Sequence, residues 1–109
     1  MSSSPQSANS SLVRRERLPL SRPYLAPRTP TEEKLAEIWR TALSMDRVGV
    51  EDRYHELGGD SFLATIILQA IAEAFPVSLQ LSVFADSPTI SELGLKIDRF
   101  VENDRVHKP

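Results

Sequence analysis

The feature that most limits the fold of this chain is a strongly apolar stretch that begins directly after Leu57-Gly58-Gly59-Asp60-Ser61. Its apolar side chains recur at helical spacing, and the stretch contains a single charged residue. We therefore predict a helix over residues 61–74. Asp60 is a suitable N-cap, and Pro76 ends the helix because the residue before a proline avoids helical angles. Ser61 is therefore expected at the first position of a helix, just after two glycines.

Another helix is predicted to begin at Pro30 and to end at about residue 43. Thr29 precedes it as an N-cap, Pro30 occupies its first position, and Glu32 lies three residues after Thr29, which together predict a capping box. One face of this helix is apolar and includes Trp39, which we expect in the core.

The C-terminal third contains a short helical pattern and a longer one. Residues 79–85 predict a short helix, and Thr89 with Glu92 forms a second capping box that begins the last helix. The expected inner face of that last helix comprises Ile90, Leu93, Ile97, Phe100 and Val101. No strand pattern competes, so we predict an all-α fold, a four-helix bundle of three main helices and one short helix.

Residues 45–60 form a long connection between the first two main helices. Its apolar side chains Val48, Val50, Tyr54 and Leu57 are expected to be buried across the helix ends. Structureless loops of this length are uncommon in compact domains and are often functional. We predict that it is the most mobile part of the body, because we expect it to have few hydrogen-bonded neighbours.

The 109 residues suffice for one domain. Residues 1–28, which are rich in serine and proline, are expected to form a flexible N-terminal arm or linker. Residues 29–101 are the expected globular domain, and residues 102–109 a polar C-terminal tail. The arm holds five arginines and one acidic residue, whereas the rest holds fourteen acidic and eight basic residues. An acidic body disfavours nucleic acid as a partner and is compatible with docking to basic protein surfaces.

The chain has no cysteine, which excludes disulfides, thiolate metal sites and a cysteine nucleophile. No apolar run approaches the roughly 18 residues of a membrane span. An apolar signal segment is also missing at the N-terminus, so we expect a cytoplasmic protein without a membrane partner.

Two kinds of chemistry are open to Ser61. A hydrolase nucleophile requires Gly-x-Ser-x-Gly after a strand, but Leu63 occupies the second glycine position and no strand is predicted. An attachment site is better supported, because a phosphate ester is favoured by the free N–H groups and positive end of a helix. Gly58 and Gly59 would let a modifying enzyme approach closely, and Asp60 would support the turn. Position alone leaves open an ordinary serine at a helix start.

Several motifs in order resolve this choice, and they extend over residues 24–101. They are the segment 48–61 with the apolar helix after it, the segment 83–93 that leads into the last helix, the segment 26–32, and Ile38-Trp39. This set resembles the peptidyl carrier, or thiolation, domain of nonribosomal peptide synthetases, in the phosphopantetheine-binding acyl-carrier-like superfamily.

The resemblance implies a carrier-protein bundle in which Ser61 receives 4′-phosphopantetheine from coenzyme A through a separate phosphopantetheinyl transferase. The thiol of that group would hold amino-acyl, aryl or peptidyl cargo as a thioester. The chain itself would be a non-catalytic, monomeric shuttle that presents cargo to adenylating, condensing, tailoring or releasing domains. Leu18-Pro19-Leu20-Ser21 also resembles the end of an adenylation domain and its linker.

The helix after Ser61 has more apolar surface than one core face requires. We therefore assign partner docking to Phe62, Thr65 and Ile66, against an alternative of core packing that is strongest for Phe62. Phe62 is larger than the aliphatic residue usual after the serine in this family. Two alternative functions stay open: an acyl carrier for polyketide or other acyl chains, and a small helical interaction domain without a prosthetic group.

Overall fold

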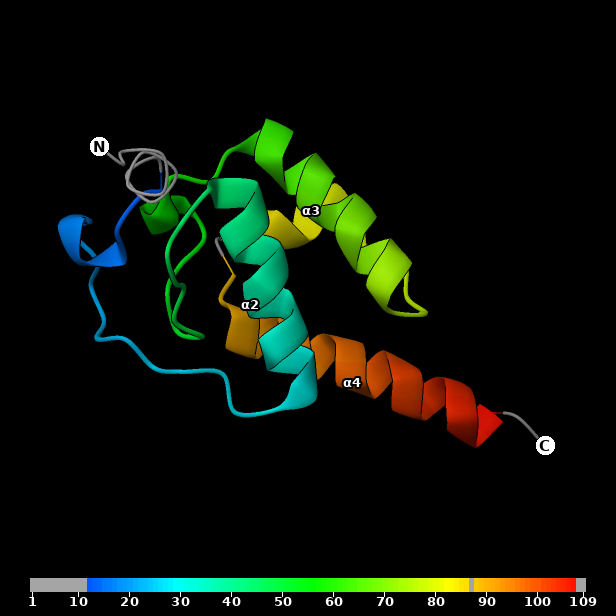
Figure 1. Cartoon of the computed structure of the whole chain (residues 1–109). Coiled ribbons are helices and arrows are strands. Elements are labelled where there is room, and N and C mark those ends of the chain that lie inside the picture. The colour runs from blue at the N-terminus through cyan, green and yellow to red at the C-terminus, as the bar shows by residue number, and fades with distance from the viewer. Residues whose placement is uncertain (1–11, 87, 108–109) are drawn as a thin grey trace, which may run out of the picture.

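In the part of the chain that the structure describes, three α-helices are joined by loops and short 3-10 turns (Figure 1). The computed structural model describes residues 12–86 and 88–107. The main helices are α2 (Pro30–Leu43), α3 (Ser61–Ala74) and α4 (Ile90–His107), and η3 (Leu81–Phe84) is the short helix before α4. Two further 3-10 turns, η1 (Arg15–Arg17) and η2 (His55–Leu57), precede α2 and α3. The all-α prediction is confirmed, with the short helix of the 3-10 type.

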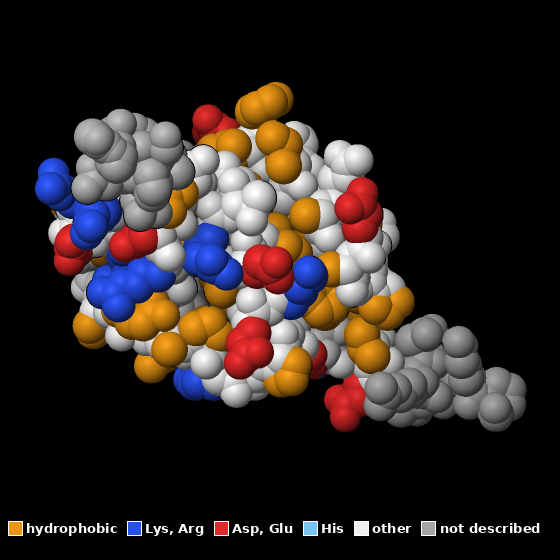
Figure 2. All heavy atoms as spheres, viewed as in Figure 1, with side chains coloured by type: hydrophobic (Ala, Val, Ile, Leu, Met, Phe, Trp, Pro, Cys, Tyr) orange, Lys and Arg blue, Asp and Glu red, His pale blue; other side chains and the backbone are white. Residues whose placement is uncertain are grey.

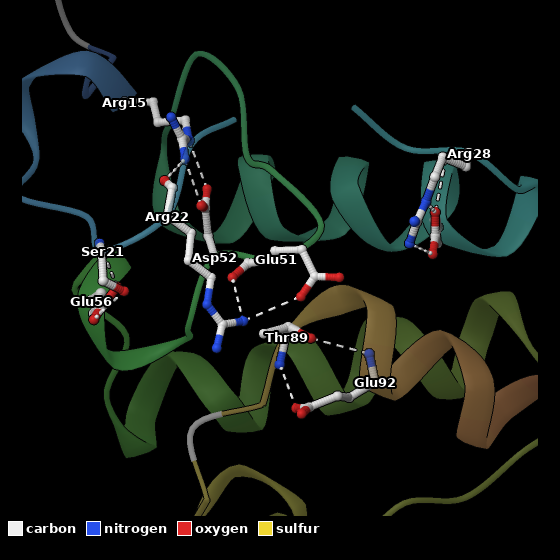
Figure 3. Close-up of polar contacts among 10 residues, drawn as sticks. Arg15, Ser21, Arg22, Arg28, Glu51, Asp52, Glu56, Thr89 and Glu92 are labelled. Carbon is white, nitrogen blue, oxygen red and sulfur yellow. Dashed lines mark hydrogen bonds and ion pairs between the residues drawn. The ribbon is translucent and has the colours of Figure 1, made fainter. Parts of the chain in front are cut away.

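Side-chain caps explain where the main helices begin. The Thr29 hydroxyl accepts the Glu32 N–H at 3.0 Å, as predicted, but the Glu32 carboxylate accepts the N–H of Arg28 at 2.8 Å and so does not close the expected box. Before α4 the box is complete, because Thr89 and Glu92 each accept the other's N–H at 3.1 Å (Figure 3).

The core lies where α2 packs against both α3 and α4 (Figure 1). Trp39 of α2, predicted to be buried, has no exposed surface. The other large side chains of the three helices that are fully buried are Leu35, Ile67, Ile71, Ile90, Leu93 and Ile97. One predicted member of the inner face is wrong: Phe100 is 53% exposed, because it lies at the surface, where it lines an open hollow with Leu79 and Val83.

The last helix is longer than predicted. We expected a polar tail over residues 102–109, but α4 continues to His107. Polarity alone does not end a helix, and no glycine or proline interrupts this segment before Pro109. Residues 108–109 lie outside the described part of the chain.

The segment over residues 12–28 lies along the loop of residues 45–60. Val13 bridges to that loop by donating its N–H to the Ser44 carbonyl at 2.7 Å and accepting the Asp46 N–H at 3.0 Å. Arg15, which we expected in a solvated linker, is 8% exposed and pairs with Asp52 (Figure 3). Residues 1–11 of the expected arm lie outside the described residues.

The loop of residues 45–60 is more firmly attached than expected. Its four predicted core residues are all buried: Val48, Val50, Tyr54 and Leu57. The Val50 N–H bonds to the Leu25 carbonyl, and the Tyr54 N–H bonds to the Pro88 carbonyl. The expected reason for high mobility, a lack of hydrogen-bonded neighbours, is therefore wrong, and the mobility itself stays a prediction.

Among the helices in the residues that the structure describes, none has both the length and the apolar character needed to cross a membrane.

Candidate attachment site

Ser61 is the first residue of α3, and its side chain is exposed. Asp60 precedes it in extended conformation and accepts the Leu63 N–H at 2.8 Å, which caps the helix as predicted. The remaining N–H groups of the first turn and the positive end of the helix dipole face the same region. The hydroxyl is thus presented where a negatively charged phosphate ester is electrostatically favoured.

The two glycines before Asp60 each have a separate structural reason. Gly58 follows η2 with φ of 89°, in the left-handed region that favours glycine. Gly59 lies against the ring of Tyr54, where an added Cβ atom would come within 2.3 Å of the ring. Both residues shape the turn into α3, in addition to any access that they give to a modifying enzyme.

Tyr54 supports this turn through a hydrogen bond and through ring packing. The sequence predicted only that its side chain is buried. Its hydroxyl donates to the backbone carbonyl of Asp60 at 2.7 Å. Its ring packs edge-on against Phe84, with 4.7 Å between ring centroids, and edge-on against Trp39 at 6.2 Å. Burial raises the pKa of the Tyr54 phenol, and the nearby charge of Asp60 raises it further, so the hydroxyl keeps its proton at neutral pH.

A hollow of about 400 Å³ opens beside Ser61. Its lining includes Tyr54, Asp60, Ser61, Ala64, Leu81 and Phe84. The mixture of apolar and polar residues suits a flexible, amide-containing chain such as a pantetheine arm, so the residues present fit this group. The sequence did not predict that Leu81, which is 44% exposed, joins this wall.

Exposed apolar side chains continue from Ser61 along α3. Phe62 is 71% exposed and Ile66 is 42% exposed, which makes the core-packing alternative wrong for Phe62. Thr65 is also exposed, and its hydroxyl donates to the Phe62 carbonyl at 2.6 Å. Figure 2 shows hydrophobic side chains at the top of the molecule, over the first turns of α3. The structure therefore brings all three predicted docking residues to the surface beside Ser61.

His55 is exposed and also lines the hollow. No group of three or more His, Cys, Asp or Glu side chains in the described residues is arranged to hold a metal ion.

A family model described as the phosphopantetheine attachment site matches residues 33–96, which is more than half of the chain. The matched region includes the whole of α3 and the loop before it.

Two curated relatives are synthases that are much longer than this chain. A linear gramicidin synthase of Brevibacillus parabrevis is 48% identical over 77 residues, which cover 71% of this chain and 2% of the relative. Indigoidine synthase of Streptomyces lavendulae is 35% identical over 85 residues, or 78% of this chain and 7% of the relative. The chain thus spans only a small part of the curated relatives that it matches.

The fold is also similar to solved carrier structures. One is a chain in the complex of the phosphopantetheine transferase Sfp with coenzyme A and a peptidyl carrier protein. The match has a TM-score of 0.67 and 32% sequence identity, and covers 70% of this chain and 99% of that chain. A second is holo-AB3403, a four-domain nonribosomal peptide synthetase bound to AMP and glycine, with a TM-score of 0.68 and 37% identity over 72% of this chain and 6% of that one.

Proposed function

The chain belongs to the phosphopantetheine attachment family and is a non-catalytic carrier domain of the nonribosomal peptide synthetase type, and on this premise we propose that Ser61 carries the 4′-phosphopantetheine group. The observation that carries the proposal is an exposed hydroxyl at the first residue of α3, at the edge of the hollow. When bound, the group supplies a thiol that holds cargo as a thioester, and the chain has no cysteine of its own.

In the attachment reaction, the Ser61 oxygen attacks the phosphorus of coenzyme A that bears pantetheine. A new oxygen–phosphorus bond forms, the pyrophosphate bond to the same phosphorus breaks, and adenosine 3′,5′-bisphosphate leaves with the electron pair. A base on the transferase takes the hydroxyl proton. Gly58, Gly59 and Asp60 support the reaction by shaping the turn and leaving space for the enzyme beside the hydroxyl.

Intact-mass analysis tests this assignment directly. The protein is incubated with coenzyme A and a broad-specificity phosphopantetheinyl transferase, and we expect the mass of one phosphopantetheine to be added. Ser61→Ala should remain unmodified. Ser82→Ala is the matched control, because Ser82 is an exposed serine on the wall of the same hollow, and it should load like the wild type. Loading of Ser61→Ala, or an unmodified wild type beside a loaded control carrier, would refute the assignment.

Docking of partner domains is assigned to Phe62, Thr65 and Ile66. Their exposure beside Ser61 supports this role, because a protein that acts on the hydroxyl or its cargo must cover the adjacent surface. The partners are the phosphopantetheinyl transferase and the adenylating, condensing, tailoring or releasing domains of a synthetase. Each contact is expected to be small and readily released, since one carrier has to visit several partners.

A charged substitution tests the docking surface. Ile66→Asp should raise the transferase KM for the carrier at least about fivefold, because a desolvated apolar contact is lost. Leu95→Asp is the control, since Leu95 is 58% exposed but lies on α4. Both variants should keep the wild-type circular dichroism spectrum. Equal KM values for the two variants would remove Ile66 from the docking surface.

The same proposal includes the cargo, which is a substrate of a synthetase, and the location, which is the cytoplasm. Coenzyme A, the donor of the group, is an intracellular metabolite, which supports that location. The matches to peptide synthases favour amino-acyl or peptidyl cargo over polyketide chains.

A further inference from the structure

The carbonyl group that precedes Ser61 is held by a buried side chain. The Tyr54 hydroxyl donates to the Asp60 carbonyl oxygen at 2.7 Å, and the same oxygen accepts the Ala64 N–H at 2.9 Å. This carbonyl belongs to the peptide unit that joins Asp60 to Ser61. Because a peptide unit is planar, two bonds to its oxygen also restrict the N–H and Cα positions of Ser61.

Tyr54 is itself held from several directions. It is 4% exposed, and its N–H donates to the Pro88 carbonyl at 3.1 Å. Its own carbonyl accepts the Gly59 N–H at 3.2 Å, and its ring packs against Phe84. Gly59 leaves only enough room for the ring, since a Cβ atom there would overlap it. The hydroxyl thus has one position, under the peptide that begins α3.

We propose that Tyr54 is a positioning residue for phosphopantetheine transfer, which acts by setting the orientation of the Ser61 hydroxyl. This inference rests on the proposed attachment at Ser61. Displacement at phosphorus requires the attacking oxygen to be aligned with the leaving group, and small errors of placement lower the rate. The Tyr54 hydroxyl does not touch the reacting atoms, so its effect passes entirely through the Asp60 peptide.

The phenylalanine variant isolates this effect. Tyr54→Phe removes one oxygen atom and leaves the ring contacts with Phe84 and Trp39 in place. We expect the kcat of transferase loading to fall about two- to tenfold, the equivalent of one lost hydrogen bond. The KM for the carrier should stay within about twofold of the wild type, because the docking side chains on α3 are unchanged.

The second tyrosine provides a matched control. Tyr24 packs beneath the side chains of Arg15 and Arg47, with 5.4 Å and 4.3 Å from the guanidinium carbons to the ring centroid. Tyr24→Phe makes the same chemical change away from Ser61 and should leave kcat unchanged. All proteins are compared at a temperature well below the lowest melting midpoint, so that each is folded during the assay.

A readout without the transferase separates positioning from general stability. In ¹⁵N-labelled protein, Tyr54→Phe should shift the amide resonance of Ser61, whereas Tyr24→Phe should not. Wild-type kcat in Tyr54→Phe, or a variant too unfolded to assay, would overturn the inference while leaving attachment at Ser61 intact. Failure of the wild type to load would instead refute the proposed function.

Discussion

Arg15 and Asp52 form a buried ion pair with two hydrogen bonds, at 2.7 Å from Nε and 2.6 Å from Nη2, across 37 positions of the chain (Figure 3). Their side chains are 9% and 0% exposed. The Arg15 Nη2 group also donates to the Arg22 carbonyl, and Asp52 accepts the Gly49 N–H at 2.8 Å. The pair joins the N-terminal segment to the loop that leads to Ser61, with its polar atoms largely satisfied.

Neutralising the buried acid should destabilise the fold. Asp52→Asn is expected to lower the free energy of unfolding by about 2–4 kcal/mol, because Arg15 then stays buried without its counter-charge. Glu51→Gln is the adjacent control, since the Arg22–Glu51 pair is 41% and 34% exposed and should contribute below about 1 kcal/mol. Urea unfolding measures both, and equal midpoints for the two variants would contradict the prediction.

The N-terminal boundary of the domain is testable by shortening the chain. A chain that begins at Leu12 keeps the Arg15–Asp52 pair, whereas one that begins at Thr29 lacks both Arg15 and the Leu25 carbonyl that accepts the Val50 N–H. We expect the shorter chain to be less stable by at least about 3 kcal/mol. Identical melting of the two chains would instead support the boundary at residue 29.

Gly94 offers a stabilising substitution within α4. A Cβ atom at this position would meet Glu32, Thr31 and Leu35 at 3.6, 3.7 and 3.9 Å, which are ordinary contacts. Gly94→Ala should therefore raise the free energy of unfolding by up to about 1 kcal/mol through helix propensity. Gly59→Ala should act in the opposite direction, because its Cβ atom would overlap the Tyr54 ring. A higher midpoint for Gly59→Ala in the same urea titration would disprove the packing argument.

Acid stability should depend on Glu32. The hydrogen bond from the Arg28 side chain holds the pKa of Glu32 below its ordinary value of 4.5, against the opposing effect of burial. A lowered pKa means that the unfolded chain binds the proton first, so this stabilisation is complete above about pH 4.5 and is lost as the pH falls through the folded-state pKa. Melting curves recorded from about pH 2 to about pH 7 measure this effect. The melting midpoint of Glu32→Gln should fall less steeply with acid than that of the wild type. Parallel curves would exclude the contribution.

Local signals predicted the helices that carry the site. The caps Thr29 and Asp60 and the stop at Pro76 led to the observed bounds of α2 and α3, and with them the place of Ser61. These signals act over a few residues, so a single sequence records them. The end of α4 was missed because a polar segment without a helix-breaking residue continues the helix, whereas we expected its polarity to end it.

Long-range pairings were beyond the reach of the sequence. Nothing local indicates that Arg15 selects Asp52 from fourteen acidic residues after position 28, or that the Tyr54 hydroxyl bonds to the carbonyl before Ser61. Whether Phe62 is buried or exposed was likewise ambiguous, since an apolar residue in the first turn of an apolar helix can lie on the core face or on the solvent face. In each case the answer depends on which elements pack together.

The attachment of residues 12–28 to the carrier's own loop also sets a mechanical limit. If these residues were a free chain, the stretch from Val13 to Arg28 would add roughly 50 Å of reach between the carrier and anything joined ahead of it. Because they lie folded back on the body, that length is not available for travel. A swing of this carrier relative to a preceding domain therefore cannot draw on the stretch from Val13 to Arg28 while that stretch stays attached to the body.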